Sequence, residues 1–130
     1  MEREVLAEAF YVARLTGEWP ARPFWMLRRC VVPYVAANQF LMLRKDGLPV
    51  AFAGWVLEPE GAAQPWRDDR YLPSATDFAA AGAVCVTELI SPMIPATRIV
   101  QEVGHWLKLD APPVWIERDA ERRVVAVHRS

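Results

Sequence analysis

The spacing of apolar residues along the chain predicts helices at its start and strands further on. Residues 2–15 have helical spacing, because apolar side chains recur every three or four positions: Leu6, Ala9, Phe10 and Ala13. A second helix is expected over about residues 20–30, where Pro20 and Pro23 suit the first turn. Pro33 is expected to disturb the end of this helix.

The pattern then changes to that of a β-hairpin. Apolar runs at about 39–44 and 49–57 flank the tripeptide Lys45-Asp46-Gly47, and Asp-Gly is a favoured pair in tight hairpin turns. Pro49 stands at the start of the second run, where a missing backbone donor is tolerated. Gly54, inside that run, permits a bulge or a close backbone approach.

The second half of the chain predicts a loop followed by a strand. Residues 58–76 are polar and contain three prolines, which indicates a loop with one short helix near 66–71. The apolar run at 82–91 predicts a buried strand. Pro92 and Pro95 would end it.

A last helix and a second hairpin close the chain. The helix is expected over residues 96–109, with Thr97 as its N-cap. Its apolar face is predicted to hold Ile99, Val100, Val103, Trp106 and Leu107. Residues 113–118 and 123–128 have the alternating pattern of paired strands.

This order of elements, α-α-β-β-loop-β-α-β-β, predicts one domain over residues 1–130. Its fold class is α+β or mixed α/β, with a mostly antiparallel sheet flanked by helices. Hydrophobic residues make up 53% of the chain, which is enough apolar material for a full core. The hairpin over 39–57 is expected to share a sheet with residues 84–91, with Cys85 buried and reduced.

Charge and hydropathy narrow the classes of function. The net charge is −1 and the pI is about 6.1, so no basic face for nucleic acid is expected. The N-terminal decapeptide MEREVLAEAF is acidic and amphipathic, unlike a signal peptide. The longest apolar stretch is too short and interrupted to span a bilayer. We therefore expect a cytoplasmic protein without a membrane span.

Few side chains offer chemistry of their own. No pair of His, Cys, Asp or Glu residues has metal-ligand spacing, and no Gly-rich loop offers the usual phosphate cradle for coenzyme A. Cys30 and Cys85 lie in apolar runs, where small buried hydrophobes are expected rather than a disulfide or a nucleophile. His105 and His128 stand alone, as packed or exposed histidines commonly do.

Four segments, in register over about residues 10–128, resemble one protein family. They are LTGEWP (15–20), NQFLMLRKDGLPVAFAGWV (38–56), TDFAAAGAVCVTELISPM (76–93) and VWIERDAERRVVAVH (114–128). They are similar to segments of the toxin-activating lysine acyltransferases, which move a fatty acyl group from acyl carrier protein to internal lysines of RTX haemolysins. The resemblance implies a GNAT-like acyltransferase fold, acyl carrier protein as acyl donor and partner, and no bound cofactor.

The same resemblance implies which positions are catalytic. The histidine of the family's motif L-H-R-x-W-P corresponds to Thr16, and the aspartate four residues before a proline corresponds to Glu88. Threonine cannot act as a base near neutral pH, whereas Glu88 keeps the carboxylate with one more methylene. Both positions are expected to face one cleft near Trp19. Alternatively, Thr16 closes a turn and Glu88 pairs with an arginine.

Aromatic residues near these positions are candidates for binding an acyl chain. They are Trp19, Phe24, Trp25, Phe52 and Trp55. Arg28 and Arg29 could meet an acidic carrier protein or lie on a solvated helix face. If His105 reached Glu88, it could replace the missing base.

The leading hypothesis is therefore a divergent protein-lysine acyltransferase, acting from acyl carrier protein on an acceptor such as an RTX-type toxin. The alternative is a catalytically silent pseudoenzyme or binding partner on the same fold, which holds an acyl chain or a client protein. The lost histidine favours the alternative, and the carboxylate of Glu88 favours the enzyme. A small-molecule acyltransferase using coenzyme A is disfavoured by the missing phosphate loop. Exposed strand edges and many aromatics predict a homodimer.

Overall fold

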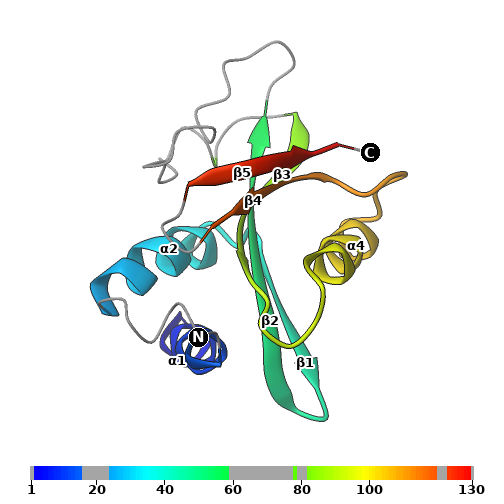
Figure 1. Cartoon of the computed structure of the whole chain (residues 1–130). Coiled ribbons are helices and arrows are strands. Elements are labelled where there is room, and N and C mark those ends of the chain that lie inside the picture. Colours follow the sequence, from blue (N-terminus) through cyan, green and yellow to red (C-terminus); the bar gives the residue numbers. More distant parts are fainter. Residues whose placement is uncertain (1, 16–23, 59–77, 79–81, 120–122, 130) are drawn as a thin grey trace.

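The computed structural model describes residues 2–15, 24–58, 78, 82–119 and 123–129. Their elements, labelled as in Figure 1, are α1 (Glu2–Arg14), α2 (Phe24–Ala36), β1 (Phe40–Lys45), β2 (Leu48–Glu58), β3 (Ala83–Ile90), α4 (Ala96–Trp106), β4 (Val114–Arg118) and β5 (Val124–His128). The described residues form an α+β fold with three helices and a five-stranded mixed, mostly antiparallel sheet.

The strands lie in the sheet in chain order, β1-β2-β3-β4-β5. Neighbouring strands are antiparallel except β3 and β4, which are parallel. Parallel neighbours need a crossover connection, and α4 supplies it. Figure 1 shows α1 and α2 on one side of the sheet and α4 on the other. The predicted shared sheet of residues 39–57 and 84–91 is confirmed.

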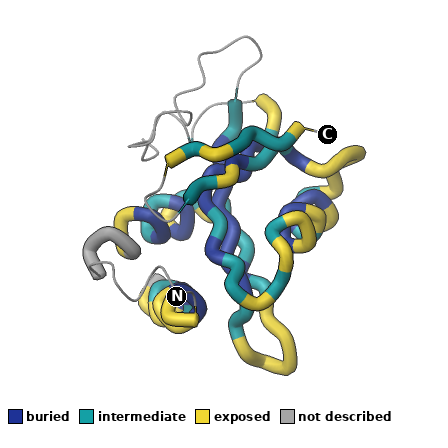
Figure 2. The backbone as a smooth tube through the Cα atoms, viewed as in Figure 1, coloured by how far each residue is buried: buried dark blue, intermediate teal, exposed yellow. Residues whose placement is uncertain are grey.

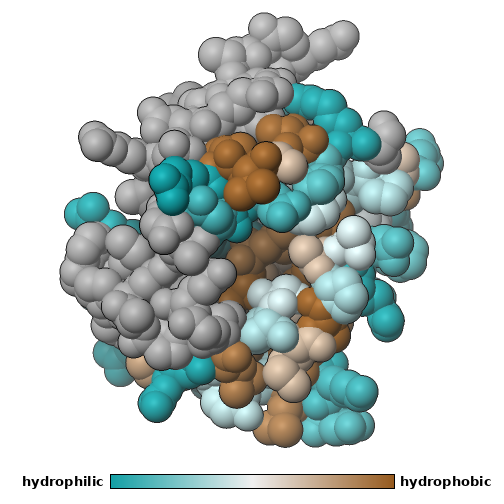
Figure 3. Space-filling model, viewed as in Figure 1, coloured by the Kyte–Doolittle hydropathy of each residue, from teal (hydrophilic) through white to brown (hydrophobic). Residues whose placement is uncertain are grey.

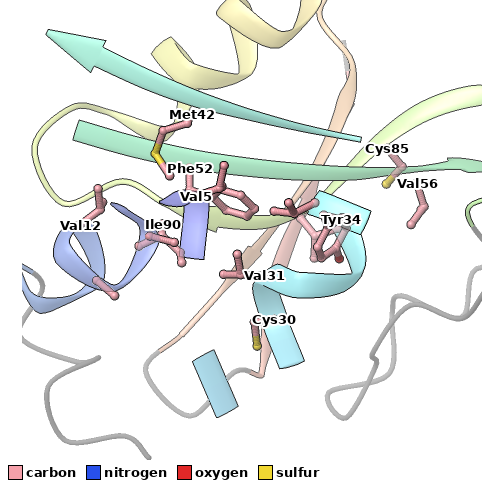
Figure 4. Close-up of a cluster of buried hydrophobic side chains, with 14 residues drawn as sticks. Val5, Val12, Cys30, Val31, Tyr34, Met42, Phe52, Val56, Cys85 and Ile90 are labelled. Atoms are coloured by element: carbon pink, nitrogen blue, oxygen red, sulfur yellow. The ribbon is translucent and has the colours of Figure 1, made fainter. Parts of the chain in front are cut away.

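Each face of the sheet has its own apolar cluster. The larger one joins the sheet to α1 and α2 and comprises Val5, Ala9, Val12, Ala13, Cys30, Val31, Tyr34, Val35, Met42, Phe52, Val56, Cys85, Ile90 and Ile116 (Figure 4). The smaller one lies under α4 and comprises Ala51, Ala53, Trp55, Val86, Ile99 and Val103. Burial is therefore concentrated in β2 and β3, which Figure 2 shows in dark blue.

The first hairpin forms where the sequence predicted it. Asp46 and Gly47 have φ angles of 53° and 81°, and positive φ at both central residues is what a two-residue type I′ turn requires. Pro49 stands opposite Arg44, beside a register shift between Leu43 and Arg44. The missing donor of the proline thus coincides with a local irregularity of the ladder.

The second helix differs from its prediction. It begins at Phe24 and runs through Pro33 to Ala36, whereas an end near residue 30 was expected. An interior proline costs a helix about 3 kcal/mol, because it lacks an N–H donor and crowds the preceding turn. Val31 and Tyr34, on either side of Pro33, are almost fully buried, and their packing offsets that cost.

Two expectations for α4 are also wrong. Pro95 occupies the N-cap without a side-chain hydrogen bond, so Thr97 lies in the first turn and does not cap it. Trp106 was expected on the apolar face with Ile99 and Val103, but it is 68% exposed. It is the last residue of the helix, where the next turn that would help to cover it is absent.

Candidate functional site

Strands β3 and β4 pair over a very short stretch. Among the described residues, their parallel ladder comprises Cys85 with Val114 and Val86 with Trp115. Beyond this point β3 continues to Ile90 and β4 to Arg118. The two strands therefore part after Val86, and the backbone groups along their facing edges are not used in a shared ladder.

A β-bulge lies where the two strands part. Gly54 of β2 stands opposite Glu88, whereas the next residue, Trp55, stands opposite Val86. Thr87 is thus an extra residue of β3 without a partner in β2. Such a residue interrupts the ladder and redirects the side chains beside it.

Tyr34 of α2 supports this bulge. Its hydroxyl and the Oγ1 of Thr87 form a buried hydrogen bond of 2.6 Å. Its ring lies directly on Gly54, where a Cβ atom would come within 2.5 Å of a ring carbon. The ring also meets Phe78 edge-on, with centroids 5.4 Å apart. Gly54 therefore lies beside a bulge, as the sequence suggested, and its close neighbour is a side-chain ring, where a close backbone approach was the expected alternative.

Glu88 lies on the same face of the sheet as Tyr34. Residues directly opposite in an antiparallel pair share a face, and Glu88 is opposite Gly54, which Tyr34 covers. Its side chain is buried, with 4% of the residue exposed. Burying a carboxylate is costly unless polar partners surround it. The structure thus places the predicted carboxylate in the interior beside the bulge, and not on a solvated surface.

Thr16 and Trp19 lie outside the described residues, and so does the cleft that Thr16 was expected to share with Glu88. Helix α1 ends at Arg14 and packs on the face of the sheet that holds Glu88. The shared cleft stays a prediction.

Of the five predicted aromatic liners, the structure describes the side chains of Phe52 and Trp55, and these two do not share a surface. Phe52 is fully buried in the larger cluster, and Trp55 is 4% exposed in the smaller one. These two residues lie on opposite faces of β2, because three positions along a strand reverse the side-chain direction. Phe24 and Trp25 begin α2.

The two histidines have different surroundings. His105 is exposed near the end of α4, on the opposite side of the sheet from Glu88. The ring of His128 stacks on Trp115 with centroids 3.9 Å apart, and its Nε2 is 2.8 Å from Oε1 of Glu117. The sequence analysis missed this group, although the predicted hairpin with period-two alternation could have placed the three side chains on one face.

The two cysteines are free and buried, as the sequence indicated. The pKa of the Cys85 thiol is raised to about 12, chiefly by burial and also by the Glu58 carboxylate, while Arg129 and Arg118 act in the opposite direction. A thiol with this pKa is protonated at neutral pH, and the thiolate is the nucleophilic form. Cys85 is therefore a packing residue of the core.

One face of the molecule is hollowed beside the parting strands. Figure 3 shows apolar atoms, in brown, lining a depression below β4 and beside α4. In the same view, Figure 1 shows β3 turning away from β4 toward α4. The depression thus lies in the part of the view where the two strands separate.

Other kinds of site find no support in the described part of the chain. Within it, no group of three or more His, Cys, Asp or Glu side chains is arranged to hold a metal ion. None of its helices is long and apolar enough to cross a membrane. Arg28 and Arg29 are exposed on α2, as a role in carrier-protein contact or a solvated face would require.

Comparison with known proteins assigns no family. No family model matches the chain, and no curated protein matches it.

Proposed function

We propose that this domain is a divergent protein-lysine acyltransferase that takes a fatty acyl group from acyl carrier protein. The observation that carries the proposal is the parting of β3 and β4 beside a buried carboxylate. The likeness of four segments to the toxin-activating acyltransferases supports it as well. The GNAT-like character of the fold is part of this proposal, because the coarser α+β arrangement also suits other functions.

The parted strands suit the arm of an acyl thioester. The prosthetic arm of acyl carrier protein is extended and contains amide groups, so it can bond to a strand edge as an added strand does. The edges of β3 and β4 beyond their two-pair ladder offer such groups. In this arrangement the thioester lies near Thr87 and Glu88, and the apolar depression beside the strands takes the acyl chain.

The reaction is aminolysis of the thioester. The lysine amine attacks the carbonyl carbon, a C–N bond forms, the C–S bond breaks, and the amine loses a proton as the thiol leaves. Glu88 is the proposed proton acceptor. A bulge leaves backbone groups out of the ladder, and an N–H of this kind near Thr87 is the proposed donor to the developing oxyanion.

A binding function on the same fold is the second candidate. It is favoured by Thr16, which stands where the resembling family has its histidine. A domain that holds the acyl chain without transferring it needs the same parted strands but no base.

The test uses acyl carrier protein charged with short, medium or long chains, together with lysine peptides as acceptors. Mass spectrometry should show acylated lysine, and Glu88→Gln should lower the rate by at least about 100-fold, the usual size of a general-base contribution. Glu117→Gln, which changes an exposed carboxylate of β4 in the same way, is the matched control and should keep the rate. Thr16→His should raise it, because it adds a titratable base.

The outcomes separate the two candidates. Tight binding of the charged carrier protein without lysine acylation, even in Thr16→His, would identify a binding module. If the domain neither binds the charged carrier protein nor acylates lysine at any chain length, both candidates are refuted.

A further inference from the structure

The β-bulge of β3 changes which side of the sheet its side chains face. Before the bulge, Cys85 belongs to the larger apolar cluster under α1 and α2, and Val86 belongs to the smaller one under α4. After the bulge, Leu89 packs against the smaller cluster and Ile90 belongs to the larger one. In a regular strand, residues an odd number of positions apart face opposite sides. Without a bulge, Cys85 and Ile90 could not both lie in the larger cluster.

The extra residue of the bulge also brings two neighbouring polar side chains to one face. Thr87 is bonded to Tyr34 of α2, and Glu88 stands opposite Gly54, which the Tyr34 ring covers. Both residues therefore face α2. A regular strand that kept Cys85 in place would turn Glu88 toward α4, because the two are three positions apart. The side of the sheet on which the carboxylate lies thus depends on the bulge.

Tyr34 is well placed to hold this bulge. Its hydroxyl and the Oγ1 of Thr87 are 2.6 Å apart and buried, and the two residues are 1% and 2% exposed. A bulge interrupts the hydrogen-bond ladder, so a side-chain bond to the extra residue replaces part of what the ladder no longer supplies there. Because the bond is shielded from water, separating the two hydroxyls is costly.

We propose that Tyr34 is a positioning residue of the candidate site. Through its bond with Thr87 it holds the bulge, and the bulge holds Glu88 on the face of the sheet that α1 and α2 cover. The effect of Tyr34 on a reaction rate rests on the proposed acyl transfer, in which Glu88 accepts the proton of the amine. Its effect on the bulge does not depend on that function and is measured separately.

Amide hydrogen exchange, followed by NMR, tests the bulge without any enzymatic activity. Tyr34→Phe removes the hydroxyl and keeps the ring over Gly54. The amides of residues 86–89 should exchange at least about fivefold faster than in the native chain, as expected when one buried hydrogen bond is lost. The amides of residues 99–103 in α4 should change by a smaller factor. An equal change in both segments would show that the hydroxyl stabilises the whole fold and not the bulge.

The kinetic test compares Tyr34→Phe, Thr87→Val and the double variant. Each single variant separates one buried hydroxyl from its partner, so its stability in urea unfolding should fall, whereas the double variant removes both hydroxyls and should recover part of that loss. Recovered stability does not return the carboxylate to its place. The kcat should therefore fall at least about tenfold in all three variants, while the KM for the charged carrier protein stays within about twofold of the native value.

Two further variants complete the test. Thr87→Ser keeps the hydroxyl and should regain most of the rate that Thr87→Val loses. Tyr11→Phe removes the hydroxyl of a tyrosine that is 47% exposed on α1, and this matched control should keep both kcat and stability.

The outcomes distinguish this proposal from the proposed function. A kcat that recovers together with stability in the double variant would overturn the positioning role of Tyr34. A native chain that acylates no lysine would refute the acyl transfer, and hydrogen exchange would then decide alone whether Tyr34 holds the bulge. Unchanged exchange at residues 86–89 in Tyr34→Phe would overturn the proposal in either case.

Discussion

Replacing Gly54 with alanine should weaken the fold at the centre of the candidate site. The added Cβ atom would lie 2.5, 2.6 and 2.9 Å from three carbons of the Tyr34 ring, well inside van der Waals contact. Tyr34 is 1% exposed, and its hydroxyl is bonded to Thr87. The ring therefore cannot move aside without breaking that bond or disturbing the core around it.

The size of the effect follows from three contributions. Overpacking a well-filled core costs about 1–3 kcal/mol. A shift of the ring that breaks the Tyr34–Thr87 hydrogen bond adds about 1 kcal/mol. The lower backbone entropy of alanine in the unfolded chain stabilises the variant by about 0.4–1 kcal/mol and offsets part of this loss. The free energy of unfolding should thus fall by about 1–3.5 kcal/mol.

The assay is urea unfolding of the native chain and the variant, followed by circular dichroism. Gly104→Ala is the matched control, because the same methyl group would there meet nothing closer than the Pro113 Cδ at 3.5 Å. Gly104 lies in α4, where alanine is favoured over glycine by about 0.8–1 kcal/mol, so this variant should be stabilised. A Gly54→Ala protein within about 0.5 kcal/mol of the native stability would show that the Tyr34 ring is not held as described.

Two further predictions concern other parts of the chain. Lys108 has a φ of 57° just after α4, in a C-terminal motif in which glycine is usual, so Lys108→Gly should raise the free energy of unfolding by about 0.5–1 kcal/mol in urea unfolding. The pKa of Cys85 is raised to about 12 in the folded state, so its contribution to stability is complete below the ordinary thiol pKa. It is lost as the pH rises toward 12, by at most about 1.4 kcal/mol per pH unit. Cys85→Ala should show a shallower loss of stability between about pH 9 and pH 11 than the native chain, and an equal slope in both proteins would contradict the assigned cause.

Much of the fold could be predicted from local sequence patterns, because the sequence signals for these elements were strong. The turn at Asp46-Gly47 depends on residues that tolerate positive φ, and such residues are legible in a sequence. Helix α2 was predicted less well, because the penalty of Pro33 is local whereas the packing of Val31 and Tyr34 that offsets it is tertiary. Trp106 was misplaced for a related reason, since helical spacing does not reveal where a helix stops being covered.

The candidate site was predicted in part for a similar reason. Glu88 could be singled out from its place before Pro92, but its burial depends on a bulge at Thr87 that arises only when β2 and β3 are paired. The stack of His128 on Trp115 depends likewise on the register of the last hairpin. Such register shifts come from the balance of packing on both faces of a sheet, and single residues carry no direct sign of them.

The short ladder between β3 and β4 has a consequence for motion. The C-terminal hairpin is joined to the rest of the sheet by two residue pairs, while Ile116 anchors it in the larger cluster. Strands held by few hydrogen bonds belong to the less stable end of a protein's local opening equilibria. The hairpin β4–β5 is therefore expected to open locally more readily than β1, β2 and β3, against the packing of Ile116, Val114, Val124 and Val127 on the larger cluster.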